Sequence, residues 1–312
     1  MNSASNVMNA SPAQTQTIAP DAVSWRRQMY WSVRRELWES RSIYIAPVAG
    51  AALTLVACSI SAMRLPERMR AAAALDPMQQ MGIIERPFDL AGLLIMGVTF
   101  LVALFYSLDS LHGERRDRSI LFWKSLPVSD LTTVLAKASI PMLVLPVLTF
   151  AATIVTQAIV FLVSRAALAG GGVHAEAAWD HFSFWHMEGM LLYHLVGIHG
   201  LWYAPFYGWL MLVSGWARRL PILWATLPPI AVGLFEKIAF NTSYFAGLIG
   251  AHFDSGPARS SSASGASAMS LDALTSPAPS EFLMSPGLWA GLVITALFLA
   301  VAVRLRRQRG PI

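Results

Sequence analysis

The sequence predicts an all-α polytopic membrane protein, with six transmembrane helices preceded by an amphipathic interfacial helix. Three observations support this fold class. Of the 312 residues, 55% are hydrophobic and only 13% are charged, about half the charged share of a soluble domain. The hydrophobic residues cluster into long runs, and the segments between the runs alternate between many and few Lys and Arg.

The chain begins with two segments of opposite character. Residues 1–23 are small and polar with a single charge, Asp21, and lack the basic and apolar parts of a secretory signal peptide. We expect a disordered cytoplasmic tail there. Residues 24–41 carry five Arg and several Trp, with Met29, Val33 and Leu37 at four-residue spacing. This pattern predicts an amphipathic helix on the membrane surface; the alternative is a solvated helix packed on another protein.

Six apolar runs approach the ~20 residues that a helix needs to cross a bilayer. Two of them are interrupted by Gly and Pro, which spans tolerate where neighbouring helices satisfy the freed backbone groups. The predicted spans are about 43–63, 90–108, 138–163, 189–213, 221–240 and 287–303.

The distribution of Lys and Arg supports this count. With the N-terminus inside, the four cytoplasmic segments hold 16 of the 23 Lys and Arg, and the three external segments hold 6. Because cytoplasmic loops are enriched in positive charge, both termini are expected in the cytoplasm. The external loop 241–286 begins with an apolar run too short to cross the bilayer, expected to be re-entrant or interfacial. It continues into Ser255–Ser280, whose composition predicts a flexible loop.

The cytoplasmic loop 109–137 contains an unusual group of apolar residues. Ile120–Trp123 reads Ile-Leu-Phe-Trp within an otherwise charged segment, and solubility does not require it. The two readings are docking of a partner protein and anchoring of Phe122 and Trp123 at the membrane surface. Pro127 predicts a break in the helix, and Ser129 predicts the N-cap of a helix that continues into the third span.

The sequence motifs of several common nucleotide-binding, metal-binding and hydrolase sites are absent from the chain. The chain has no G-x-x-x-x-G-K-[ST], H-E-x-x-H, C-x-x-C or G-x-S-x-G sequence. The single cysteine, Cys58, is expected to be a packing residue. The basic residues flank apolar runs, which indicates topology rather than nucleic-acid binding. No metal site is expected, because the spacing of the gathered histidines is poor; these are His174, His181, His186, His194 and His199.

Glu236 and Lys237 are ionisable residues within the fifth predicted span, which marks them as candidates for the transport path. Lys237 is expected to extend outward to the membrane surface while Glu236 faces the bundle. A structural role for Glu236, as a cap or hydrogen-bond acceptor, is the alternative.

Two local motifs carry a resemblance to a known family. They are Glu114–Ile120 (ERRDRSI) and Ser125–Ser129 (SLPVS), followed by Lys137. Together with the order of elements over residues 24–308, they resemble the ABC-2 type permease family, with its type V exporter-like architecture. The resemblance implies a dimer, homomeric or heteromeric, of six-span subunits in a bacterial cytoplasmic (inner) membrane. It also implies separate ABC ATPase subunits, which bind the ATP, so that this chain needs no cofactor and is not itself an enzyme.

In that family the second-to-third loop forms a coupling helix, which here corresponds to about Gly113–Leu126. We expect the apolar residues to fill a groove on the ATPase, with Glu114, Arg115 and Arg116 at the rim of the interface. The ATPase-coupling residues implied by the resemblance are Glu114, Arg115, Arg116, Ser119, Leu121, Phe122, Trp123, Leu126 and Pro127.

The expected function is therefore that of an exporter permease for an unidentified substrate. The alternatives are an ion- or proton-coupled carrier and an intramembrane enzyme. A carrier usually has ionisable residues in several spans, yet the first, second, third and last spans contain no Lys, Arg, Asp or Glu. An intramembrane enzyme needs aligned carboxylates, a Ser–His pair or metal ligands, and the spans contain none that align.

Overall fold

The computed structural model describes residues 24–173, 183–254 and 279–312, and every regular element in these ranges is a helix. The predicted tail 1–23 and most of the predicted flexible loop lie outside the described residues. Within the described ranges, five helical stretches are long and apolar enough to cross a membrane. They are Ser42–Met63, Gln79–Arg116, Asp130–Gly170, Pro221–Phe240 and Pro286–Gln308.

The first part of the chain forms α1 (Trp25–Glu39), α2 (Ser42–Met63), α3 (Leu65–Ala71), α4 (Pro77–Asp109), α5 (His112–Arg116), α6 (Ile120–Lys124), α7 (Asp130–Ser139), a π-helix η1 (Ile140–Val144) and α8 (Leu145–Gly170). The second part forms α10 (Phe184–Tyr193), a π-helix η2 (His194–Trp202), α11 (Ala204–Trp216), α12 (Pro221–Phe240), α13 (Tyr244–Asp254), α14 (Pro279–Met284) and α15 (Pro286–Gln308).

One helix, α4, extends far beyond the span predicted for it. α4 begins at Pro77 rather than near residue 90, and its 33 residues reach ~50 Å, well over the ~30 Å of a hydrocarbon core. The extension is stabilised by packing, since Ile84 and Phe88 are buried with Leu168 near the end of α8. The same cluster contains Cys58, which confirms its prediction as a packing residue.

The fourth predicted span, 189–213, is not a single regular helix. It is divided into α10, η2 and α11, and it is not among the five stretches above. Gly200 explains part of this geometry, because a Cβ at that position would lie 2.5 Å from the carbonyl oxygen of Met142. The two π-helices therefore contact each other backbone to backbone, at a site where only glycine fits.

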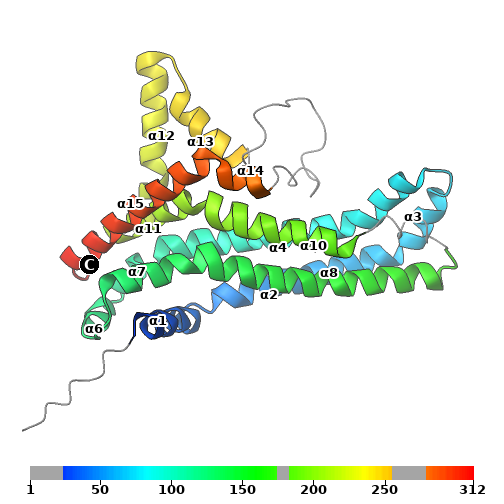
Figure 1. Ribbon diagram of the computed structural model, residues 1–312, viewed down its shortest axis with the longest axis horizontal. Helices are drawn as coiled ribbons and strands as arrows, with labels where there is room; N and C mark the ends of the chain where they lie inside the picture. The colour runs from blue at the N-terminus through cyan, green and yellow to red at the C-terminus, as the bar shows by residue number, and fades with distance from the viewer. Residues whose placement is uncertain (1–23, 174–182, 255–278) are drawn as a thin grey trace, which may run out of the picture.

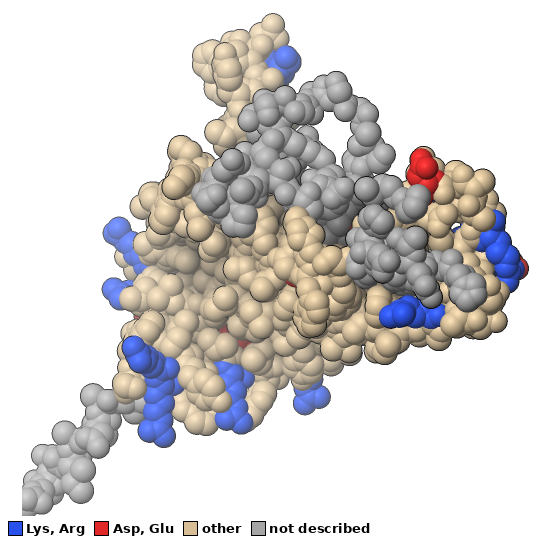
Figure 2. All heavy atoms as spheres, turned by 45° about the vertical axis from the view of Figure 1, so that its right-hand side comes forward, with Lys and Arg blue, Asp and Glu red and all other residues tan. Residues whose placement is uncertain are grey.

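The long helices lie side by side along the longest axis of the molecule (Figure 1). α2, α4 and α8 pack together, and α11 packs against α15 and α4. At one end α1 crosses the bundle against α7, close to α6 and the C-terminal residues, whereas α3 lies at the opposite end. We call these the loop end and the α3 end. In Figure 2 most of the Lys and Arg lie toward the two ends of the molecule, and few charged side chains are visible on the surface between them.

α12 stands away from this bundle (Figure 1). Among its residues only Ala225 is buried. The residues that flank it, Leu220 and Asn241, both have left-handed backbone conformations, with φ of 48° and 51°. Beyond this turn α13 returns toward η2, where the Trp202 indole donates to the carbonyl of His252 at 2.8 Å. Within the described part of one chain, the apolar surface of α12 is thus almost entirely uncovered.

Candidate functional site

The loop 109–137 folds as two short helices instead of one coupling helix over about Gly113–Leu126. α5 and α6 are separated at Arg118, which has a left-handed φ of 58°. α6 ends at Lys124, before Pro127, so the predicted helix break is confirmed. The predicted N-cap is confirmed as well, because the Ser129 hydroxyl accepts a hydrogen bond from the Thr132 amide at 3.0 Å.

Glu114 lies at the centre of a buried group of charges at the loop end. One carboxylate oxygen lies 3.1 Å from Lys137 Nζ on α7 and 3.5 Å from Arg35 Nη2 on α1. The other accepts a hydrogen bond from the Arg306 guanidinium on α15. This single side chain therefore connects α5 to three other helices.

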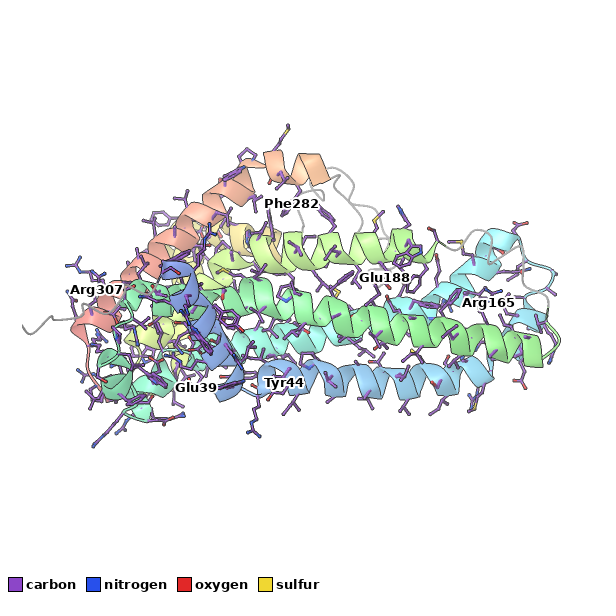
Figure 3. All side chains as sticks on the ribbon, turned by 60° about the horizontal axis from the view of Figure 1, so that its bottom comes forward. Glu39, Tyr44, Arg165, Glu188, Phe282 and Arg307 are labelled. Atoms are coloured by element: carbon purple, nitrogen blue, oxygen red, sulfur yellow. The ribbon has the colours of Figure 1, made fainter. Side chains whose placement is uncertain are left out.

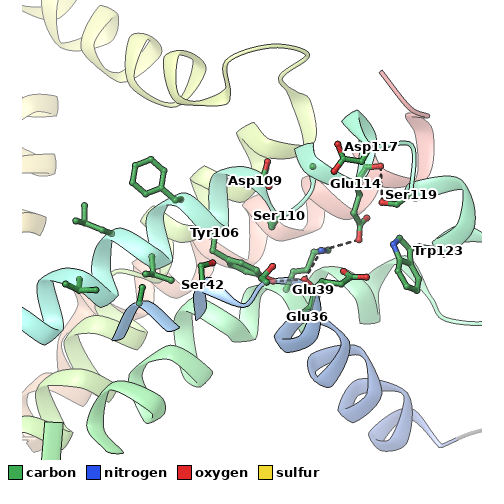
Figure 4. A pocket seen from close by; sticks show the side chains of 18 residues that line it. Glu36, Glu39, Ser42, Tyr106, Asp109, Ser110, Glu114, Asp117, Ser119 and Trp123 are labelled. Carbon is green, nitrogen blue, oxygen red and sulfur yellow. Dashed lines mark hydrogen bonds and ion pairs between the residues drawn. The ribbon is translucent and has the colours of Figure 1, made fainter. Parts of the chain in front are cut away.

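Glu36 on α1 is the second centre of this group. Its carboxylate lies 2.9 Å from Lys137 Nζ and 2.6 Å from Arg35 Nη2, and it accepts a hydrogen bond from the Tyr106 hydroxyl at 2.9 Å. Figure 4 shows Glu36, Tyr106 and Glu114 close together, with dashed lines for the contacts between the residues drawn. Asp130 extends the group at 3.0 Å from Arg306 Nε. We call this group the ionic cluster: Arg35, Glu36, Glu114, Asp130, Lys137 and Arg306.

The electrostatics of the ionic cluster favour charged side chains despite their burial. Burial by itself raises the pKa of Glu36. The positive charges of Lys137 and Arg35 together lower it by more than burial raises it, so the pKa lies below its ordinary value. Glu36, Lys137 and Arg306 are each at most 5% exposed. Buried ions are tolerated only when they are paired and hydrogen-bonded, and the ionic cluster provides both.

The predicted rim of charges is wrong for two of its three residues. Glu114 and Arg115 are buried, at 7% and 6% exposed, and only Arg116 is exposed. Arg115 donates to the carbonyl oxygens of Gly215, at 2.9 Å, and Gly310, at 3.3 Å. Apart from Lys137, their partners lie about 80 to 200 residues distant in the sequence, so the local sequence gave little sign that these side chains point inward.

The apolar residues of the loop divide into an anchor and an exposed surface. Ile120 is buried, and Trp123 is half-buried with the Arg35 guanidinium 4.0 Å from its ring centre. Leu121 and Phe122 are 59% and 60% exposed. Ser119 is half-buried beside the carbonyl oxygen of Glu114. The exposed apolar residues, which we call the loop tip, are Leu121, Phe122, Leu126 and Pro127.

A cavity of roughly 710 Å³ lies beside the ionic cluster (Figure 4). It is bounded by α1, the start of α2, the second half of α4 and the loop. One part of its wall is apolar, with Leu101 and Phe105, and the other carries carboxylates, with Glu39 and Asp109. The sequence analysis singled out no residue of α1, α2 or α4 for this region.

Glu236 organises the turn between α12 and α13. Its carboxylate accepts hydrogen bonds from the Thr242 hydroxyl at 2.9 Å and from the amides of Tyr244 at 2.6 Å and Phe245 at 2.8 Å. A carboxylate at a helix N-terminus satisfies amides that have no partner within the helix. These contacts give Glu236 a structural role, and Lys237 is exposed. A role of either residue in a transport path stays a prediction.

The histidines do not form a metal site in the described part of the chain, which contains no group of three or more His, Cys, Asp or Glu able to hold an ion. His174 and His181 lie outside the described residues. His199 is buried on η2 with its ring 5.7 Å from that of Phe100. These contacts indicate packing for His199.

Glu188 on α10 is a buried residue that the sequence analysis did not assign to the transport path. It is 2% exposed, and neither carboxylate oxygen has a hydrogen-bond partner among the described residues. Figure 3 places it toward the α3 end, far from Glu39. An acidic residue adjacent to an apolar run was the available signal. No family model, curated protein or solved structure matches this chain, so its function is argued from its residues and geometry.

Proposed function

We propose that this chain is the permease subunit of an ABC exporter of the ABC-2 type, with six spans and the loop end in the cytoplasm of a bacterial cell. A separate ATPase subunit docks on the loop 109–137 and supplies the energy of ATP hydrolysis. The observation that carries this proposal is the loop tip: exposed apolar side chains on a segment that buried charges attach to the membrane helices.

The loop tip has the chemistry of a protein interface. Leu121 and Phe122 offer apolar area, and exposed apolar patches that are held in place mark interaction sites. A five-residue helix such as α6 is not stable by itself in water. Here it is held by the buried Ile120 and by the contact of Trp123 with Arg35, so it presents Leu121 and Phe122 at a fixed position.

The ionic cluster supplies a mechanical connection. A displacement of α5 moves Glu114, and Glu114 contacts α1, α7 and α15 through Arg35, Lys137 and Arg306. α7 continues through η1 into α8, which spans the length of the bundle. A partner that pulls on the loop tip therefore acts on helices that would line the transport path.

The decisive experiment removes the exposed apolar side chains and leaves the anchor intact. Truncation of a central interface residue costs about 2–4 kcal/mol, so Leu121→Ala with Phe122→Ala should weaken ATPase docking roughly 30- to 1,000-fold. The measurement is co-purification of the ATPase in mild detergent from the native membrane. Phe235→Ala is the matched control, since Phe235 is 67% exposed on α12.

The two readings of the loop tip give opposite results. Under docking, the double variant loses its ATPase and keeps the unfolding temperature of the wild type in lipid. Under membrane anchoring, it retains the ATPase and melts at a lower temperature in lipid. Full retention of the ATPase would refute the coupling role.

A second candidate function, an ion- or proton-coupled carrier, is favoured by one observation. Glu188 is a buried carboxyl group without a hydrogen-bond partner among the described residues, and such a group within a membrane bundle is a functional-site hypothesis by default. Reconstitution distinguishes the candidates: a carrier moves substrate in response to an imposed pH gradient in vesicles without ATPase or ATP. The permease moves substrate only when the ATPase and ATP are both present, whether or not a pH gradient is imposed.

A further inference from the structure

We propose that the cavity at the loop end binds amphiphilic cations, molecules with an ammonium head and an apolar tail. This inference rests on the proposed function, because it makes the cavity the place where an exporter takes up its substrate. Its volume of roughly 710 Å³ falls within the ~300–1,000 Å³ of small-molecule sites. It is lined by five carboxylates and by one cationic side chain, Lys137, which already pairs with Glu36 and Glu114.

Among the described residues, the cations near the cavity do not fully neutralise its negative charge. Glu39 has one ion pair, with Arg35 at 3.7 Å, and that guanidinium also contacts Glu36 and Glu114. Asp109 lies 3.8 Å from Arg116, whose nearer partner is Asp117 at 3.0 Å. Glu39 and Asp109 therefore have capacity for a further cation. Burial, reinforced by the charges of Glu36 and Glu114, raises the pKa of Glu39 although Arg35 opposes it, and a bound ammonium would relieve that repulsion.

The opposite part of the wall suits an apolar tail. Leu101 and Phe105 lie on successive turns of α4, and both line the cavity. Their side chains are 54% and 59% exposed. The lining continues to Val98, ~16 Å along α4 from Asp109. There the space narrows, because α2 approaches α4 so closely that a Cβ on Gly50 would lie 3.3 Å from the Val98 side chain. The cavity thus runs from carboxylates at the loop end into the apolar layer of the bundle.

This combination selects among ligand classes. An anion is disfavoured by the carboxylates, and a neutral apolar molecule would displace water from Glu39 and Asp109 without supplying a further positive charge. An ammonium over an exposed aromatic face such as that of Phe105 gains a further attraction. Both an aminophospholipid and a soluble cationic amphiphile have this chemistry.

The test measures binding of tritiated decyltrimethylammonium to the purified full chain in dodecyl maltoside, with decyl sulfate as a competitor of the same tail length. Decyltrimethylammonium should bind saturably, and decyl sulfate should not displace it. Glu39→Gln with Asp109→Asn should weaken binding roughly tenfold or more. The matched control is Glu67→Gln with Asp76→Asn, two exposed carboxylates at the α3 end.

The outcomes separate this inference from the proposed function. Equal affinity in both double variants, or displacement by decyl sulfate, would overturn it; an unchanged unfolding temperature shows that the variants are folded. Ala46→Phe, which fills the cavity without altering charge, should also weaken binding if the ligand occupies this space.

Co-purified ATPase without binding refutes only the cavity proposal, and binding without an ATPase refutes only the permease. Displacement by lysophosphatidylethanolamine identifies the source as lipid, and its failure identifies a soluble cation.

Discussion

The two ends of the bundle bury ionisable groups in different ways. At the loop end Glu36, Glu114, Lys137 and Arg306 are buried together, and each has an oppositely charged partner within about 3 Å. Toward the α3 end Glu188 is equally buried, yet the described residues offer its carboxylate no hydrogen bond. Because an unpaired buried group costs stability that a paired one does not, the loop end is built for structural connection, and Glu188 marks a site held at a cost.

The largest effect should come from breaking the ionic cluster. Lys137→Met leaves Glu36 and Glu114 short of a cation in a buried site, which typically costs about 3–5 kcal/mol. Thermal unfolding of the purified protein measures the loss. Lys124→Met is the control, because Lys124 is exposed and its ammonium donates to a carbonyl oxygen of Arg309 rather than to a buried carboxylate. Equal unfolding temperatures for the two variants would mean that the pairs contribute nothing.

A smaller loss of stability is expected from a substitution at the contact between η1 and η2. Gly200→Ala forces a Cβ against the Met142 carbonyl oxygen, and overpacking of this kind costs about 1–3 kcal/mol. Gly197→Ala is the matched control on the same π-helix, since its Cβ would meet only side chains at 3.4 Å or more. Equal unfolding temperatures for the Gly200→Ala and Gly197→Ala variants would show that the two π-helices can move apart at little cost.

The loop end should also weaken in acid. The pKa of Glu36 is below the 4.5 of an unperturbed glutamate, so its contribution is fully present above pH 4.5 and is lost as the pH falls through the lower, folded value. Unfolding temperatures between pH 7 and pH 3 should therefore fall below pH 4.5, and less steeply in Glu36→Gln. Glu67→Gln, at an exposed site, should follow the wild type; identical profiles for Glu36→Gln and the wild type would contradict this assignment.

The smallest effect on stability, and the sharpest contrast, is expected at Glu188. Glu188→Leu removes a buried carboxyl group that has no described partner, so the change should be within about 1 kcal/mol or stabilising. Transport assays on the same variant show whether the carboxyl group is retained for function. A loss as large as that of Lys137→Met would mean that Glu188 is paired after all.

The local features of the loop could be read from the sequence, and its connections could not. The cap at Ser129 and the break before Pro127 follow from the chemistry of one or two residues. The inward orientation of Glu114 depends on Arg306, 192 residues away, and no local pattern encodes such a pairing. For Glu36, the available sign of an inward orientation was its position beside the apolar residues Val33 and Leu37.

Helix existence was predictable from hydropathy, and helix length was not. α2 and α12 agree with their predicted spans within a residue or so, because composition alone sets the length that crosses a bilayer. The 13 extra residues of α4 are helical because Ile84 and Phe88 find partners on α3 and α8. The π-helix of the fourth run depends on a close backbone contact, which hydropathy does not report.

The contact between Glu114 and Arg306 also sets an order of events during synthesis. Lys137 emerges from the ribosome soon after Glu114, but Arg306 follows 169 residues after Lys137. At about 5–20 residues per second, the newly inserted N-terminal helices wait roughly 10–30 s for the cation that completes the ionic cluster. During that interval Glu114 has its contacts with Arg35 and Lys137 but lacks its contact with Arg306, so the ionic cluster is complete only in chains whose translation has reached the last helix.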